Sequence, residues 1–124
     1  MAAGASILIV DDNASNTKLL AFLLTSKGYV VRTAASAPEA LAVLEEFRPR
    51  LILMDIQLPG MDGLTLTRRL KADPRTRDIA IIAATAYAMK GDEARALEAG
   101  CNGYITKPID TRRLPQDIER YLAS

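Results

Sequence analysis

The sequence contains no histidine, and this absence removes several kinds of chemistry. Without an imidazole the chain has no Ser-His-Asp triad, no histidine acting as acid or base, and no histidine ligand for zinc. The single cysteine, Cys101, excludes an intrachain disulfide. The formal net charge is only +1, with 16 Lys and Arg against 15 Asp and Glu, which does not favour nucleic acid as a partner through bulk charge.

Long apolar runs are also missing. No apolar stretch approaches the roughly 20 residues that a membrane-spanning helix requires, so we expect no transmembrane segment and no membrane partner. The first residues lack the basic start of a signal peptide, and Asp11 and Asp12 interrupt the nearest apolar run. We therefore expect a cytoplasmic protein.

What is present is the composition of one folded domain. The 124 residues are 49% hydrophobic and 25% charged, enough for one sizeable core without a disulfide or structural metal. No linker or low-complexity tract divides the chain. We expect residues 1–124 to form a single domain, with no output domain after the last helix.

Strand and helix patterns alternate along the chain. Short apolar or β-branched runs predict strands at residues 7–10, 29–34, 51–54, 79–85 and 104–106. Apolar residues at helical spacing follow each run, and Ser36 with Glu39 has the spacing of a capping box. Five strand–helix units predict an α/β fold, a flavodoxin-like, doubly wound parallel sheet of five strands.

The last helix contains a proline. If Asp110 caps this helix, Pro115 falls in its second turn and removes a backbone hydrogen bond there. The helix then starts late or bends.

Polar residues gather where the predicted strands end. Asp11 and Asp12 follow the first strand, Asp55 the third, Thr85 the fourth and Lys107 the fifth. Ligands bind at this edge of a doubly wound sheet. Three neighbouring carboxylates repel one another unless a cation is present, and oxygen ligands of this kind suit Mg²⁺. Singly, each residue has an ordinary structural explanation; their joint placement favours a site.

The same edge suggests phosphoryl chemistry. With Mg²⁺ and Lys107 to neutralise developing charge, Asp55 is the candidate nucleophile that forms an acyl phosphate. Thr85 is then placed to donate a hydrogen bond to a phosphoryl oxygen.

Four motifs carry a specific resemblance: ILIVDDN at residues 7–13, LMDIQLPGMDG at 53–63, ATA at 84–86 and TKP at 106–108. The chain resembles the receiver domain of bacterial two-component response regulators over essentially its whole length. The resemblance implies that Asp55 accepts a phosphoryl group from a partner's phosphohistidine. It also implies that Asp11, Asp12, Asp55 and the Gln57 backbone carbonyl arrange Mg²⁺, with Mn²⁺ as a possible substitute.

The resemblance further implies a switch. Thr85 moves toward the phosphoryl group and Tyr104 turns inward, which remodels the face of the fourth helix, fifth strand and fifth helix. Without that role, Tyr104 is a half-buried aromatic of the fifth strand. The Lys107–Pro108 peptide bond resembles the family's cis-proline.

The segment 84–93 is similar to DivK-type single-domain regulators and to receivers excised from hybrid histidine kinases, and both contexts stay open. The implied partners are a sensor histidine kinase or histidine phosphotransfer protein and a downstream protein target, with the chain a monomer or weak dimer.

The resemblance implies no conventional enzyme, but a protein that catalyses its own phosphorylation and slow dephosphorylation. Gln57 stands where an aspartyl phosphatase places a second acid. A flavodoxin-like electron carrier is disfavoured because Asp11 and Asp12 would repel an FMN phosphate. An interaction module that is never phosphorylated remains the alternative.

Overall fold

The computed structural model describes residues 4–58, 60–85 and 91–123. Within them, five parallel strands form one sheet in the order β2-β1-β3-β4-β5. The strands are β1 (Ser6–Val10), β2 (Val30–Ala34), β3 (Leu51–Asp55), β4 (Ala80–Thr85) and β5 (Gly103–Thr106). The helices are α1 (Ala14–Ser26), α2 (Ala37–Glu46), α3 (Gly63–Ala72), α4 (Asp92–Ala99) and α5 (Leu114–Leu122). The predicted doubly wound α/β fold is confirmed.

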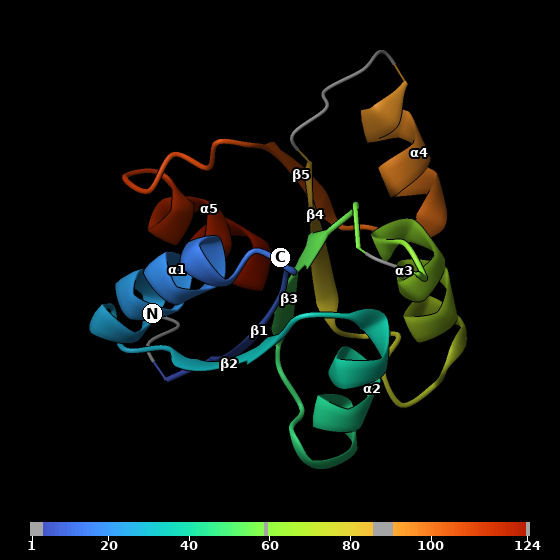
Figure 1. Ribbon diagram of the computed structural model, residues 1–124, viewed down its shortest axis with the longest axis horizontal. Coiled ribbons are helices and arrows are strands. Elements are labelled where there is room, and N and C mark those ends of the chain that lie inside the picture. The colour runs from blue at the N-terminus through green and yellow to red at the C-terminus, as the bar shows by residue number, and fades with distance from the viewer. Residues whose placement is uncertain (1–3, 59, 86–90, 124) are drawn as a thin grey trace.

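The sheet lies between two layers of helices, with α1 and α5 on one side and α2, α3 and α4 on the other (Figure 1). Successive strand residues point to opposite faces, so each face has its own core. In β1, Leu8 packs in the core beneath α2, α3 and α4, whereas Ile7 and Ile9 pack in the core beneath α1 and α5. Burial on both faces explains why the central strands are continuous apolar runs.

The strand order reverses between β1 and β3, and this reversal positions the site. The chain leaves β1 toward β2 on one side and continues from β3 toward β4 and β5 on the other. Val10 pairs in register with Met54, so the next residues, Asp11 and Asp55, stand at the same level of adjacent strands. Ligand sites in such sheets form at this kind of reversal.

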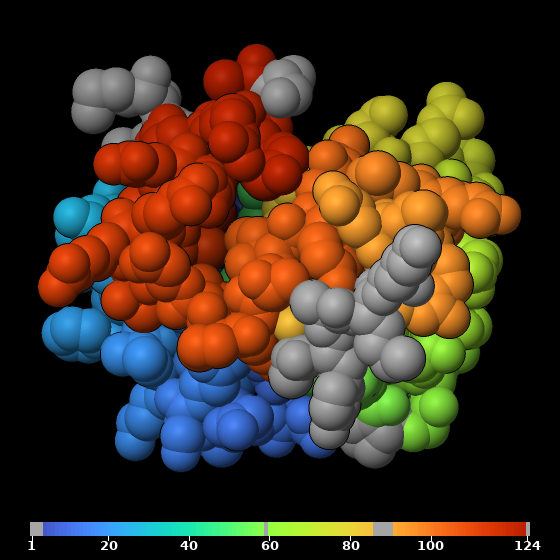
Figure 2. All heavy atoms as spheres, turned by 90° about the horizontal axis from the view of Figure 1, so that it is seen from above, coloured from blue at the N-terminus to red at the C-terminus, as the bar shows by residue number. Residues whose placement is uncertain are grey.

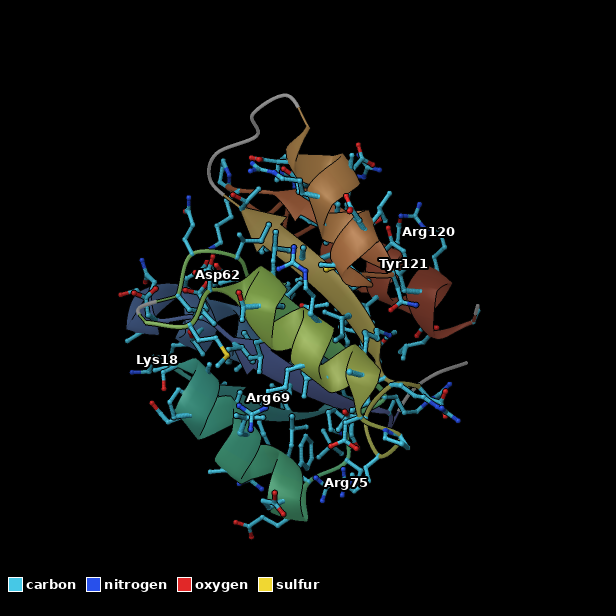
Figure 3. All side chains as sticks on the ribbon, turned by 90° about the vertical axis from the view of Figure 1, so that its right-hand side faces the viewer. Lys18, Asp62, Arg69, Arg75, Arg120 and Tyr121 are labelled. Carbon is cyan, nitrogen blue, oxygen red and sulfur yellow. The ribbon has the colours of Figure 1, made fainter. Side chains whose placement is uncertain are left out.

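Polar side chains fix where three helices begin. Asn13 caps α1 by accepting a hydrogen bond from the Asn16 N–H, and Ser36 caps α2 as predicted, accepting from the Glu39 N–H. Asp62 does the same for α3 and lies at the start of that helix (Figure 3). These caps set the entry of each helix relative to the edge where the strands end.

Pro115 delays the last helix rather than bending it. The Asp110 backbone carbonyl accepts hydrogen bonds from the Arg113 and Leu114 N–H groups, and α5 begins at Leu114 with Pro115 in its first turn. A proline there loses no helical hydrogen bond. Asp110 is therefore not the cap of α5, and its side chain accepts instead from the Arg112 N–H.

None of the helices in the described part of the chain is both long enough and apolar enough to cross a membrane.

Candidate functional site

Three carboxylates meet where β1 and β3 end. Asp11, Asp12 and Asp55 each offer a carboxylate oxygen, and these oxygens all lie within 4.8 Å of one another. Asp11 and Asp55 are buried, with 5% of each residue exposed, while Asp12 is exposed. Two acids are thus held rigidly by the fold, and the third opens the cluster to solvent.

Lys107, the residue after β5, reaches both buried acids. Its Nζ lies 3.0 Å from Asp11 Oδ2 and 3.4 Å from Asp55 Oδ2. Its backbone N–H donates to the Thr85 carbonyl at 2.7 Å, which joins the ends of β4 and β5. The Lys107–Pro108 peptide bond is cis. One cation is therefore shared between two carboxylates from different strands.

The electrostatics of these groups follow from burial and pairing. Burial and the neighbouring Asp11 charge raise the pKa of Asp55, although the Gln57 N–H and Lys107 oppose the rise. Burial also raises the pKa of Asp11, but hydrogen bonds from Asn13, Asn16 and Lys107 outweigh it and hold this pKa below its ordinary value. Burial lowers the pKa of Lys107, but its bond to Asp11 and both negative charges outweigh burial and raise it.

The start of α1 wraps around Asp11. The Asn13 N–H donates to Asp11 Oδ1 at 2.9 Å, and the Asn16 side-chain amide donates to Asp11 Oδ2 at 2.7 Å. The Thr17 hydroxyl contacts the Asp11 carbonyl at 3.3 Å. Sequence analysis missed Asn16. The three-residue spacing from the capping Asn13 was the available signal, because one helical turn brings such a residue back toward the strand end.

The start of α3 packs directly on Asp55. A Cβ on Gly63 would lie 2.2 Å from the Asp55 carbonyl oxygen, and the Gly63 N–H donates to the Ile56 carbonyl at 2.8 Å. The Gln57 N–H donates to Asp55 Oδ1 at 3.1 Å. The backbone after β3 therefore fixes the direction of the Asp55 carboxylate.

Thr85 and Tyr104 lie on adjacent strands and differ in their burial and neighbours. Thr85 is buried at the end of β4, and it borders a cavity of about 390 Å³ together with Gln57 and residues of α3 and α4. Tyr104 lies half-buried on β5 and packs against the core beneath α2, α3 and α4. Burial and the negative charges of Asp92 and Glu93 raise its pKa. Tyr104 therefore lies near the acids at the start of α4.

Not every quoted motif residue can be placed. Pro59, in the motif at 53–63, and residues 86–90, in the segment 84–93, lie outside the described residues.

The acid cluster fits a divalent metal. Lys107 supplies one positive charge against three carboxylates, so a further cation would reduce their repulsion, and an exposed acid leaves coordination positions for water, as Mg²⁺ prefers.

Comparisons with known proteins identify one family. Residues 7–119 match the family model described as the response regulator receiver domain. The polar-differentiation response regulator DivK of Brucella anthropi is 48% identical over 117 residues, which cover 94% of this chain and 95% of that protein.

Solved structures of response regulators and receiver domains superpose on this chain. A putative response regulator from Chloroflexus aurantiacus superposes with a TM-score of 0.92 at 35% identity, covering 98% of this chain and 99% of that one. The receiver domain of a sensor histidine kinase from Pseudomonas aeruginosa, solved with a magnesium ion coordinated in its active site cleft, gives 0.88 at 38% identity, covering 98% and 100%. Receiver domains interact with histidine kinases or phosphotransfer proteins. The chain belongs to the response regulator receiver domains of two-component signalling systems.

Proposed function

We propose that Asp55 is the phosphoacceptor of this receiver and that the donor is a phosphohistidine on a sensor histidine kinase or a histidine phosphotransfer protein. The observation that carries the proposal is the sharing of Lys107 between Asp55 and Asp11 inside the carboxylate cluster. Phosphoryl transfer needs a held nucleophile, compensating positive charge and access for a donor. These three requirements correspond to Asp55, Lys107 and the exposed side of Asp12.

In the transfer, one bond to phosphorus forms while another breaks. A carboxylate oxygen of Asp55 forms a bond to phosphorus, while the bond between phosphorus and the donor's imidazole nitrogen breaks and its electron pair stays on the imidazole. The Gln57 N–H holds Asp55 Oδ1 in a fixed direction, and Lys107 balances negative charge on the transferred group.

The residues that would hold Mg²⁺ are Asp11, Asp12, Asp55 and the Gln57 backbone carbonyl, and Mn²⁺ is a possible substitute with the same preference for oxygen. When bound, the ion supplies positive charge to the phosphoryl oxygens. The burial of Asp11 and Asp55 keeps two of these carboxylates in place before any ion arrives.

The signal would leave the site through Thr85 and Tyr104. The buried Thr85 hydroxyl would donate to a phosphoryl oxygen, and the Tyr104 ring would turn inward in response. The surface that would change comprises α4, β5 and α5. Seen from above, α4 and α5 flank the segment that joins them on one continuous surface (Figure 2). A protein target that binds this surface would read the phosphorylation state.

Slow loss of the phosphoryl group and output through protein contacts complete the proposal. Gln57 supplies no acid or base for hydrolysis, so the phosphorylated state would persist long enough to be read. We expect a monomer or weak dimer in the cytoplasm, working as a single domain. The likeness extends both to free-standing DivK and to a receiver of a sensor histidine kinase.

The test is intact-protein mass spectrometry after incubation with acetyl phosphate and Mg²⁺. We expect the mass of one phosphoryl group to be gained, lost at alkaline pH, and absent from Asp55→Asn. Asp62→Asn is the matched control, because Asp62 is a nearby acid and asparagine caps a helix equally well. Labelling that survives Asp55→Asn would move the acceptor elsewhere. No labelling of folded wild-type protein would favour the unphosphorylated interaction module.

A further inference from the structure

Asp11 is the most completely bonded carboxylate of the cluster. Its Oδ1 accepts from the Asn13 N–H, and its Oδ2 accepts from two donors, the Asn16 amide at 2.7 Å and the Lys107 ammonium at 3.0 Å. The backbone bond is fixed by the fold and Lys107 carries a charge. Asn16 alone among these three supplies a neutral side-chain donor.

Lys107 forms ion pairs with two carboxylates, and phosphorylation of Asp55 would change which of the two attracts it more strongly. Its Nζ is closer to Asp11 than to Asp55, at 3.0 Å against 3.4 Å. Phosphorylation replaces the Asp55 carboxylate, with one negative charge, by an acyl phosphate that carries up to two, and it brings three acceptor oxygens there. Lys107 is then drawn toward Asp55 and away from Asp11.

If Lys107 moved away, the buried Asp11 carboxylate would lose one of its hydrogen-bond donors. Asp11 is only 5% exposed, so even with the positive charge that Mg²⁺ would supply, a buried carboxylate oxygen that loses a hydrogen-bond donor carries a desolvation cost. The Asn16 amide already sits on the oxygen that Lys107 would leave. Because it is neutral, the charge on the phosphoryl group draws it much less strongly than it draws Lys107.

Asn16 is also held in place for this role. Its own N–H donates to the capping Asn13 side chain at 3.0 Å, which fixes the first turn of α1, and its side chain reaches back from there to Asp11. An asparagine that served the helix alone would need no contact with a carboxylate from the neighbouring strand end. We propose that Asn16 is a positioning residue for phosphoryl transfer, which keeps Asp11 bonded so that Lys107 can move to the phosphoryl group on Asp55. This inference rests on the proposed function.

The test compares two ligands. Calorimetry first measures binding of Mg²⁺ alone, then binding of beryllofluoride, a stable analogue of an aspartyl phosphoryl group, in excess Mg²⁺. Beryllofluoride requires Lys107 to shift, whereas Mg²⁺ alone does not. For Asn16→Leu we expect beryllofluoride affinity to fall about tenfold, the effect of losing one hydrogen bond to a charged group. Affinity for Mg²⁺ alone should fall by a smaller factor, because the Lys107 ammonium stays on Asp11 when no phosphoryl analogue is bound. Ser15→Ala, an exposed neighbour on α1, should change neither affinity.

Two results would overturn the role of Asn16. One is a beryllofluoride affinity in Asn16→Leu equal to that of wild type. The other is an equal loss of affinity for Mg²⁺ and for beryllofluoride, which would indicate general damage to the site. Asn16→Ala carries the same comparison if the leucine variant does not fold. Wild-type protein that binds Mg²⁺ but not beryllofluoride would refute the phosphoacceptor function itself, and this inference with it.

Discussion

Gly63 lies so close to Asp55 that a single added methyl group would overlap the Asp55 carbonyl oxygen, at 2.2 Å. The contact is between backbone atoms, so no side chain can rotate to relieve it. The first turn of α3 is thereby held against the end of β3, at the residue that we propose as phosphoacceptor.

Gly63→Ala should therefore lower both stability and phosphorylation. Because α3 must move away from β3, we expect the free energy of unfolding to fall by about 1–3 kcal/mol, measured by urea denaturation. Phosphorylation by acetyl phosphate should slow as well, since the Asp55 backbone shifts. Gly4→Ala is the control: its φ of +90° strains an alanine, but no atom lies within 4 Å of the added Cβ. Gly63 itself has no positive φ, so Gly4→Ala shows what strain without a contact costs. Unchanged stability and phosphorylation in Gly63→Ala would contradict the importance of the contact with Asp55.

Asp12→Ala should weaken the stabilisation that Mg²⁺ provides. A ligand at a hundred times its Kd adds about 2.7 kcal/mol to stability, and a tenfold rise in Kd removes about 1.4 kcal/mol of that gain. Thermal melts with and without Mg²⁺ measure the gain. Asp62→Asn should keep all of it, because the Asp62 carboxylate belongs to the cap of α3. An unchanged Mg²⁺ gain in Asp12→Ala would exclude Asp12 from the metal site.

Lys107→Met should make stability depend on pH in a new way. Without the cation, two buried carboxylates repel each other, so their pKa values in the folded state rise above those in the unfolded state. An acid with a raised folded pKa costs stability at high pH and regains it as pH falls. We expect a deficit on the order of 2 kcal/mol near pH 7 that shrinks toward about pH 5, measured by denaturation without Mg²⁺. A deficit independent of pH would indicate lost packing instead.

Tyr29 should stabilise the fold up to strongly alkaline pH. Its hydroxyl donates to Glu119 at 2.7 Å, and burial together with that carboxylate raises the pKa of Tyr29 from 10.0 to about 12. A group whose folded pKa is raised contributes fully below its unfolded pKa, so this contribution should be lost between about pH 10 and pH 12.

Tyr29→Phe checks this directly. The variant should be less stable by about 1 kcal/mol at neutral pH, and its deficit should vanish as pH rises through that window. Tyr121→Phe, which removes a hydroxyl that accepts a hydrogen bond from the exposed Arg120 (Figure 3), is the matched control for the loss of a tyrosine hydroxyl. A constant deficit for Tyr29→Phe at every pH would mean that the bond to Glu119 contributes nothing.

The fold and the meeting of the acids were predictable from sequence because they depend on patterns along the chain. Apolar runs identify the buried strands, and the topology then brings Asp11 and Asp55 to adjacent strand ends. Ser36 was predictable as a cap because its bond is local.

Other features depend on contacts that no local pattern specifies. A polar residue in the first turn of a helix usually faces water, so the three-residue spacing from Asn13 did not by itself identify Asn16 as a partner of Asp11. The overlap between Gly63 and Asp55 depends on the angle at which α3 meets β3. The sequence left two outcomes for Pro115, and the turn at the Asp110 carbonyl decides between them.

The site takes its residues from the ends of four strands that lie far apart in the chain: Asp11, Asp55, Thr85 and Lys107. No fragment that lacks one of these strands contains the whole set. Under the proposed function, a partly unfolded or truncated molecule would therefore be unable to accept the phosphoryl group. Phosphorylation would then mark, under that function, only molecules in which all four strand ends are assembled.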